Sequence, residues 1–210
     1  MLQNIFNPTL TQVRLVLKPL VFVTSLIPAT LVVGGATGIL AYDLGANPVE
    51  TIQDECGIWG LRFILLTLAM TPLRLILGAA WPLRLRRMLG LFAFFYASLH
   101  FLNYLILDQG LEIGAIVEDI IERPFITIGA ASILLLLPLA ITSTAGWRRR
   151  LGRRWIKLHR AVYVVGILVC WHFWWQVKQD ISEPLLYVTI LVVLLGIRIW
   201  DQRRRQQQTP

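Results

Sequence analysis

Charged residues are scarce in this 210-residue chain, since only 15% of the residues are Asp, Glu, Lys or Arg while 56% are hydrophobic. Soluble globular domains carry about 25% charged residues, so the composition excludes that class and indicates a polytopic membrane protein. Six spans of about 20 residues each would use more than half of the length. No room remains for a separate soluble domain, and we therefore expect any soluble chemistry to reside on a partner.

The chain also lacks the usual signatures of catalysis and of nucleotide or zinc binding. Its two cysteines, Cys56 in a polar loop and Cys170 in an apolar run, form no CxxC or Cys/His zinc spacing. The one glycine cluster, at positions 34, 35 and 38, lies inside an apolar run with no strand before it, so it is not a dinucleotide fingerprint. No Ser/His/Asp or Cys/His set can be assembled, and we predict no catalytic residue.

Long apolar runs separated by short polar breaks predict the fold. The expected spans are residues 20–42, 58–79, 89–107, 124–145, 160–177 and 185–200. The fold class is therefore an all-α membrane protein, a bundle of six transmembrane helices over residues 20–200. Residues 1–19 form a cytoplasmic N-terminal segment in this interpretation, and residues 201–210 form a polar cytoplasmic tail.

Basic and acidic residues sort to opposite sides of these spans. Seventeen of the 20 Lys and Arg residues fall on the side of both termini, and eleven of the 12 acids fall on the other side. The positive-inside rule then places both termini in the cytoplasm and the acidic loops outside. On that outer side, the spacing of apolar residues in 111–123 predicts an amphipathic helix with its acids on the other face. This helix is either packed on the bundle or a docking surface for an outer partner.

Histidine is rare, with three residues in the whole chain, and two of them are predicted to lie at the same membrane depth. His100 follows Arg87 by 13 residues and His172 follows Arg160 by 12 residues, so both lie about 18–20 Å along outward-running helices. Buried imidazoles on facing helices commonly hold a heme iron. We therefore predict His100 and His172 as axial ligands of a b-type heme in the outer half of the bilayer; the alternative is a pair of hydrogen-bonded core histidines.

The third histidine, His159, lies among basic residues at the cytoplasmic mouth. It precedes His172 by 13 residues, or about 220° of rotation, so an ideal helix would not turn both toward the same side. A bulge or a late helix start would be needed for both to face inward. His159 is either a ligand of a second, inner heme or an interfacial histidine paired with lipid phosphate or a carbonyl group. Arg86 stands where a histidine on the third span would complete an inner pair.

Arginines near the second and third spans leave two interpretations open. Arg62 and Arg74 lie in or at the ends of the second span, where snorkelling to the interface is the simpler explanation. The alternative is that basic residues near the inner face bind heme propionates or the head group of a flavin or quinone. That set comprises Arg74, Arg84, Arg86 and Arg87.

Several of these motifs together resemble a known family over nearly the whole chain. They are Thr71-Pro72-Leu73, Arg86-Arg87-Met88-Leu89-Gly90-Leu91, Ala97-Ser98-Leu99-His100, Glu122-Arg123-Pro124-Phe125, and the basic run from Leu151 to Arg160 that contains His159. The sequence resembles the MsrQ (YedZ) family, the heme-binding membrane subunits of bacterial protein-methionine-sulfoxide reductase systems. That family belongs to the ferric reductase-like transmembrane superfamily.

The resemblance implies cofactors and site residues. His100 and His172 would be the outer metal ligands and His159 one inner ligand, with Arg86 in the place of the fourth histidine. One heme b is expected, and a second remains open because of that departure. FMN is attributed to the family, although no flavin motif is found here.

The resemblance also implies a role and a place in the cell. A member of this family takes electrons from the quinone pool or a cytosolic flavin reductase. It passes them across the bacterial inner membrane to MsrP, a periplasmic molybdenum-cofactor enzyme that repairs oxidised methionine in proteins, so the catalytic site is expected on the partner. Two alternatives are a ferric or oxygen reductase acting directly at its outer face, and a cofactor-free transporter or assembly factor.

Overall fold

The regular elements of this computed structural model, which describes residues 8–177 and 180–207, are all helices. They are α2 (Leu10–Gln12), η1 (Val13–Leu17), α3 (Lys18–Ala36), α4 (Pro48–Leu77), η2 (Trp81–Arg84), α5 (Arg86–Asn103), η3 (Tyr104–Asp108), α6 (Ile113–Glu122), α7 (Pro124–Ile141), α8 (Ala145–Leu151), α9 (Arg153–His159), α10 (Ala161–Gln176) and α11 (Ser182–Gln207). Within these described residues, six stretches are long and apolar enough to cross a membrane: Leu10–Ala36, Pro48–Leu77, Arg86–Asp108, Pro124–Ile141, Arg153–Gln176 and Ser182–Gln207. The predicted all-helical membrane protein with six spans is confirmed.

Several helices extend beyond the apolar runs that predicted them. The first begins at Leu10, the second begins at Pro48, and the last continues to Gln207. Asn47 caps the N-terminus of α4 by accepting a hydrogen bond from the Glu50 backbone N–H. Hydropathy marks only the part of a helix that lies in hydrocarbon, whereas helical hydrogen bonds continue through polar residues. For this reason the placement of Cys56 in a loop is wrong: Cys56 is buried inside α4.

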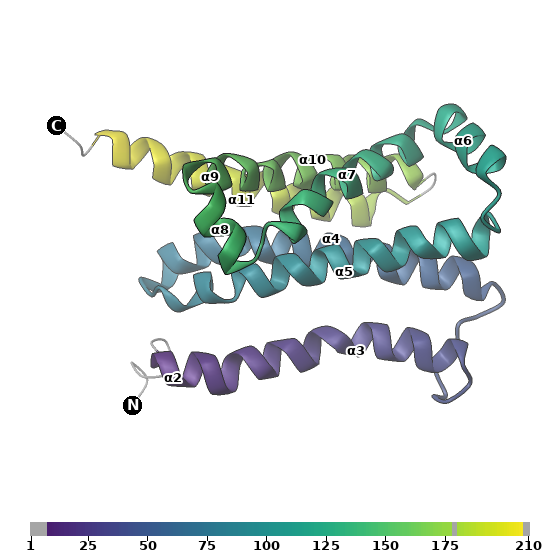
Figure 1. The fold of residues 1–210 in the computed structure, drawn as a ribbon, viewed down its shortest axis with the longest axis horizontal. Coiled ribbons are helices and arrows are strands. Elements are labelled where there is room, and N and C mark those ends of the chain that lie inside the picture. Colours follow the sequence, from purple (N-terminus) through teal and green to yellow (C-terminus); the bar gives the residue numbers. More distant parts are fainter. Residues whose placement is uncertain (1–7, 178–179, 208–210) are drawn as a thin grey trace.

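The helices form three layers, with α3 on one side, α4 and α5 in the middle, and α7, α10 and α11 on the other side (Figure 1). α4 is the most enclosed span, since half of its most apolar window is buried inside the protein. A stack of aromatic rings fills the space between α4 and α5, with ring centres of Phe63 and Tyr96 5.4 Å apart and those of Phe63 and Phe92 5.5 Å apart. The middle layer is therefore the packed centre of the bundle.

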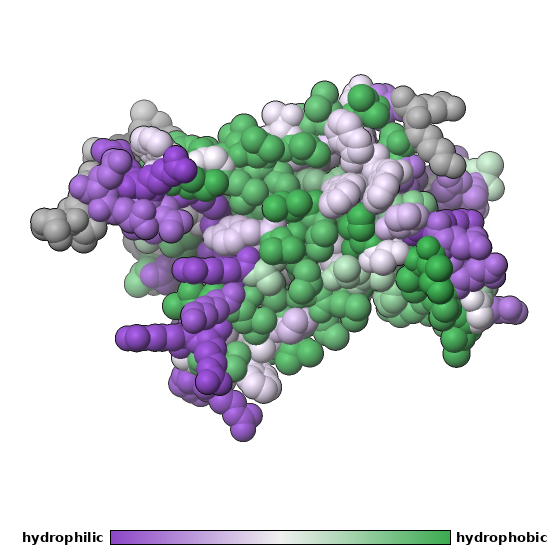
Figure 2. All heavy atoms as spheres, turned by 90° about the horizontal axis from the view of Figure 1, so that it is seen from above, coloured by the Kyte–Doolittle hydropathy of each residue, from purple (hydrophilic) through white to green (hydrophobic). Residues whose placement is uncertain are grey.

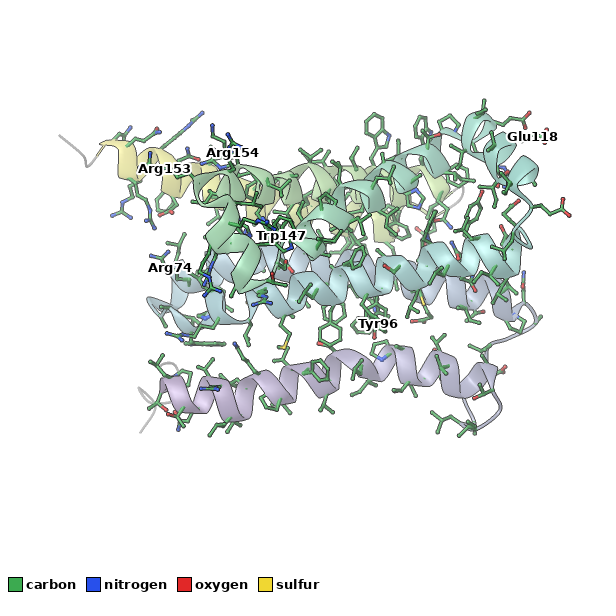
Figure 3. All side chains as sticks on the ribbon, viewed as in Figure 1. Arg74, Tyr96, Glu118, Trp147, Arg153 and Arg154 are labelled. Atoms are coloured by element: carbon green, nitrogen blue, oxygen red, sulfur yellow. The ribbon has the colours of Figure 1, made fainter. Side chains whose placement is uncertain are left out.

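The surface reflects a membrane environment. Apolar side chains cover the waist of the molecule and hydrophilic ones gather at its two ends (Figure 2). Helix α2 begins and α11 ends at the same end of the bundle, as the even number of spans requires (Figure 1). Arg74, Arg153 and Arg154 lie toward that end, whereas Glu118 lies at the opposite end (Figure 3). We refer to these as the basic end and the acidic end.

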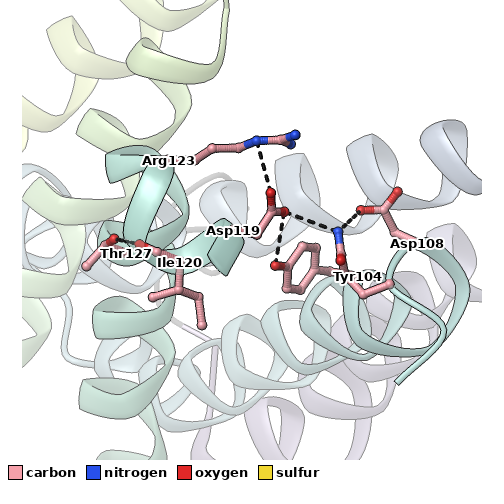
Figure 4. Close-up of polar contacts among 7 residues, drawn as sticks. Tyr104, Asp108, Asp119, Ile120, Arg123 and Thr127 are labelled. Atoms are coloured by element: carbon pink, nitrogen blue, oxygen red, sulfur yellow. Dashed lines mark hydrogen bonds and ion pairs between the residues drawn. The ribbon is translucent and has the colours of Figure 1, made fainter. Parts of the chain in front are cut away.

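Helix α6 covers the acidic end between α5 and α7 and confirms the predicted amphipathic helix. Asp119 holds it in place: its carboxylate pairs with Arg123 at 3.0 Å and accepts hydrogen bonds from Tyr104 Oη at 3.2 Å and Gln109 Nε2 at 3.1 Å (Figure 4). Part of its apolar stripe remains open, since Ile113 is 77% exposed and Ile121 is 74% exposed. The side that packs on the bundle carries the half-buried residues Ile116, Asp119 and Ile120.

Candidate functional site

The structure brings two of the three histidines together near the acidic end. His100 lies in the last turn of α5 and His172 lies in the last two turns of α10. Their ring centres are 6.1 Å apart, and the ring planes cross at 88°. The two residues are 72 positions apart in the sequence, so equal depth on the two outward-running helices is what makes the meeting possible.

Each imidazole is fixed by a backbone carbonyl group on a neighbouring helix. Nδ1 of His100 lies 2.9 Å from the carbonyl oxygen of Gln53 on α4, and Nδ1 of His172 lies 2.6 Å from that of Phe125 on α7. A carbonyl oxygen only accepts hydrogen bonds, so Nδ1 carries the proton in both rings and Nε2 keeps its lone pair. This is the arrangement in which proteins present histidine to a metal ion.

A glycine lies one helical turn after each of these carbonyl groups and faces the same ring. A Cβ atom added to Gly57 would lie 2.9 Å from Nδ1 of His100, and one added to Gly129 would lie 2.9 Å from Cε1 of His172. Real Cβ atoms do not approach ring atoms that closely, so only glycine leaves each imidazole its present position. Side-chain size at these positions therefore fixes where the two rings lie.

The two histidine environments repeat along the chain with the same spacing. Each carbonyl acceptor precedes its histidine by 47 residues, and Gly57 and Gly129 each precede theirs by 43 residues. Sequence reasoning missed both glycines and both carbonyl partners. The repeated Gly-x42-His spacing, together with the shared His-Phe dipeptide at positions 100–101 and 172–173, was the signal that would have identified them.

The separation of the rings suits a metal ion between them. Two metal–imidazole bonds of about 2 Å each, and about 1 Å from each nitrogen to its ring centre, together span about 6 Å. The amide of Gln53 lies beside this position, with its Nε2 atom 3.2 Å from Nε2 of His100 and its Oε1 atom accepting from Asn103 at 2.7 Å. A metal ligated by His100 would replace that amide contact, and the two imidazoles would then be the nitrogen donors available to an iron.

His159 lies toward the basic end, away from this pair, at the C-terminus of α9. The helix is interrupted at Arg160, between α9 and α10, which agrees with the expectation that a regular helix could not direct His159 and His172 inward together. The ring of His159 stacks on Trp155 at 3.8 Å, and its Nδ1 atom lies 3.1 Å from the Trp155 carbonyl oxygen. Its Nε2 atom is buried and makes no hydrogen bond of normal geometry among the described residues, although the Leu139 backbone lies nearby.

The arginines of the predicted inner set do not converge on one place. Arg86 is half-buried, and its charge acts on both His159 and Arg198. Arg87 is exposed. Arg74 lines a hollow of about 410 Å³ with Asp201 and Gln202 of α11, and the lining of this hollow includes neither Arg86 nor His159. Arg86 is therefore the member of this set that interacts with the inner histidine.

Sequence reasoning also missed Arg198 of α11, which reaches into the inner half of the bundle. Its guanidinium donates hydrogen bonds to Tyr163 Oη at 2.8 Å and to the Leu68 carbonyl oxygen at 2.5 Å. Its Nε atom is buried without a partner among the described residues. The sequence shows a basic residue in a long apolar run. Whether its side chain points into the bundle depends on how α11 packs against α4.

Comparison with known proteins gives a consistent result. Residues 56–170 match the family model of the ferric reductase like transmembrane component. A relative from Xanthomonas euvesicatoria is 55% identical over 166 residues, which cover 79% of this chain and 76% of the relative. One from Rhodospirillum rubrum is 51% identical over 193 residues, covering 90% and 91%. Both are named protein-methionine-sulfoxide reductase heme-binding subunit MsrQ.

Proposed function

Because the chain belongs to the MsrQ heme-binding subunit family, within the ferric reductase-like transmembrane components, we propose that it conducts electrons through heme b across a bacterial inner membrane. The observation that carries the proposal is the pair of His100 and His172, whose ring centres are 6.1 Å apart. Each ring has its Nδ1 atom on a carbonyl oxygen and a glycine against its face.

In this proposal the heme supplies reversible one-electron chemistry, and the protein supplies its ligands and surroundings. His100 and His172 would hold the iron through Nε2. The carbonyl groups of Gln53 and Phe125 would keep both imidazoles neutral and oriented, and would strengthen them as electron donors to the metal. The aromatic stack of α4 and α5 ends at Tyr96, one helical turn before His100.

The route of the electrons is the finer part of the proposal. The donor would be the quinone pool or a cytosolic flavin reductase, and the acceptor a periplasmic MsrP with a molybdenum cofactor. The basic end would face the cytoplasm by the positive-inside rule, so the histidine pair would lie on the acceptor side. The reductase chemistry itself would take place on MsrP, and no catalytic residue is assigned to this chain.

We assign the inner level to His159, whose Nε2 atom is buried and makes no hydrogen bond of normal geometry to the part of the chain that the structure describes. It would be one ligand of a second heme, and half-buried Arg86 would balance the charge of a propionate group there. Arg74 and Arg87 are retained only as surface basic groups for a propionate or for FMN. Heme stoichiometry in the purified protein decides this point, because two hemes per chain require the inner site, whereas a single heme that is lost in both His100→Ala and His172→Ala excludes it.

The test compares heme in membranes that express the wild type and three histidine variants. Dithionite should produce a b-type spectrum in the wild type, and His100→Ala or His172→Ala should abolish the outer heme. His159→Ala serves as the matched control and should retain it. Unchanged spectra and heme content in both outer variants would overturn the ligand assignment, and a wild type without b-type absorbance would favour a cofactor-free protein.

The acceptor is tested with the reduced, purified protein. Reoxidation should require MsrP together with methionine sulfoxide. Rapid reoxidation by ferric chelates or oxygen alone, at the same rate with and without MsrP, would instead support direct reduction at the outer face.

A further inference from the structure

Arg62 is a charged residue deep in the second span that neither the histidine pair nor the inner level uses. Seven residues, or about 10 Å of helix rise, separate it from Glu55 at the acidic end, and twelve residues, or about 18 Å, separate it from Arg74. The distance between those two charged residues is about the thickness of the hydrocarbon core. Arg62 therefore lies well inside the hydrocarbon layer, in its outer half.

Arg62 cannot reach the membrane surface without losing the contacts that hold it. Its Nε atom donates a hydrogen bond to Tyr187 Oη of α11 at 2.9 Å, and its guanidinium lies 4.8 Å from the ring centre of Trp59. A guanidinium carries five N–H donors, and the described residues provide no further hydrogen bond and no ion pair for Arg62. Four strong donors thus remain for a ligand at this depth.

These donors line a cleft of about 400 Å³ between α3 and α4. Glu55, Trp59 and Arg62 form one wall, since the i, i+4, i+7 spacing places them on one face of α4. The opposite wall is the apolar face of α3, which contributes Thr24, Ile27, Pro28 and Leu31. Tyr42, which follows α3 in the chain, also lines the cleft. Ile27 and Leu31 are exposed, so the cleft opens toward lipid.

The α3 wall is held at a fixed place by Tyr96 of α5. The hydroxyl group of Tyr96 donates to the Ser25 carbonyl oxygen at 2.7 Å and accepts from the Ala29 backbone N–H at 3.1 Å. An uninterrupted α-helix would pair those two groups with each other, so the hydroxyl is inserted into the backbone ladder of α3 beside Pro28. The hydrogen bonds of Tyr96 to the α3 backbone therefore fix the position of α3 and, with it, the width of the cleft.

We propose that this cleft binds the ring of a membrane quinone or quinol. A phosphate head group remains at the membrane surface, whereas a neutral ring with carbonyl or hydroxyl oxygens enters the hydrocarbon core. The Nη atoms of Arg62 donate to one ring oxygen, Trp59 provides a flat surface for the ring, and the Glu55 carboxylate accepts a hydrogen bond from a hydroxyl group at the outer side. The isoprenoid tail leaves through the opening beside Ile27 and Leu31.

The cleft is connected to the region of His100 through two aromatic side chains. The ring centres of Trp59 and Tyr96 are 6.5 Å apart, and Tyr96 precedes His100 by one helical turn. The inference rests on the proposed function because it gives a binding site to the quinone that was proposed there as the electron donor. It assigns the head group to Arg62 rather than to the basic set at the other end of the bundle.

The test uses the full-length protein in nanodiscs and a photoreactive azidoquinone, with decylubiquinone as competitor. Labelling should fall in the α3 or α4 peptides that carry the cleft residues, and excess decylubiquinone should suppress it. Leu31→Trp fills the cleft and should weaken labelling at least tenfold. Val33→Trp adds the same side chain at an exposed position of α3 outside the cleft and should label as the wild type does.

Two arginine variants test the head-group contact. Arg62→Gln should weaken labelling at least tenfold, and Arg62→Lys, which keeps the charge, should restore part of it. If Arg62→Gln does not fold, the comparison of Leu31→Trp with Val33→Trp still decides. Three results would overturn the proposal. The first is wild-type labelling in both Leu31→Trp and Arg62→Lys, and the second is labelling confined to other helices. The third is a loss of labelling in Arg74→Gln alone.

Two further measurements separate the possible failures. A phospholipid that co-purifies with the wild type and is lost in Leu31→Trp, without displacement by decylubiquinone, would overturn the choice of ligand. The heme spectrum is recorded for every variant. Labelling in a protein without heme would contradict the proposed function alone, and heme without labelling would contradict the quinone site alone.

Discussion

A methyl group added at Gly129 would press directly on the imidazole of His172. The Cβ atom of alanine would lie 2.9 Å from Cε1 and 3.1 Å from Nδ1 of that ring, where 3.4–4 Å is ordinary contact. The ring must therefore withdraw by about 0.5 Å, because the packed backbone on the other side cannot yield as easily. Its short hydrogen bond to the Phe125 carbonyl oxygen, 2.6 Å, would be disturbed by the same movement.

The size of the effect follows from the cost of overpacking. Extra methyl groups in packed sites cost about 1–3 kcal/mol, and about 1.4 kcal/mol corresponds to a factor of ten in affinity. We expect Gly129→Ala to weaken heme binding by about 5- to 100-fold. The low-spin ferric EPR spectrum should also change, because the ring planes that now cross at 88° would be reoriented.

The assay is a heme titration of apoprotein in detergent, followed by EPR of the loaded protein. Gly196→Ala is the matched control, since a Cβ atom there meets nothing within 4 Å, and it should behave as the wild type does. A Gly129→Ala protein with wild-type heme affinity and an unchanged EPR spectrum would refute the role given to this glycine, and with it the interpretation of the ring positions.

Three further predictions test other parts of the structure. Gly57→Ala should reproduce the heme effects of Gly129→Ala at the His100 side, and a normal heme titration there would contradict the repeated architecture. Tyr96→Phe should lower the unfolding free energy by about 1 kcal/mol with heme content retained, because the freed groups of α3 can restore their own helical bond; thermal melts would measure it, and a wild-type Tm would contradict it. Asp119→Asn should speed hydrogen exchange in α6 without affecting heme, because it weakens the ion pair with Arg123; unchanged exchange rates would show that α6 is held by other contacts.

Much of the fold was predictable from the sequence because hydrophobic length has a direct physical meaning in a bilayer. A run of about 20 apolar residues must be helical to satisfy its backbone hydrogen bonds there, and this argument identified all six spans. Helix ends were predicted less well. Leu10 and Pro48 begin their helices about ten residues before the apolar runs, since polar residues such as Glu50 and Gln53 continue a helix outside hydrocarbon.

The sequence by itself determined which histidines meet, because helix rise is constant and depth can be counted from the charged edges. Only the tertiary structure decided what surrounds them. Counting along one helix carries no information on how it is rotated against its neighbours, so the contacts of Gly57 with His100 and of Gly129 with His172 appear only once α4, α5, α7 and α10 are packed. The same rotation decides that Arg62 lines the cleft between α3 and α4.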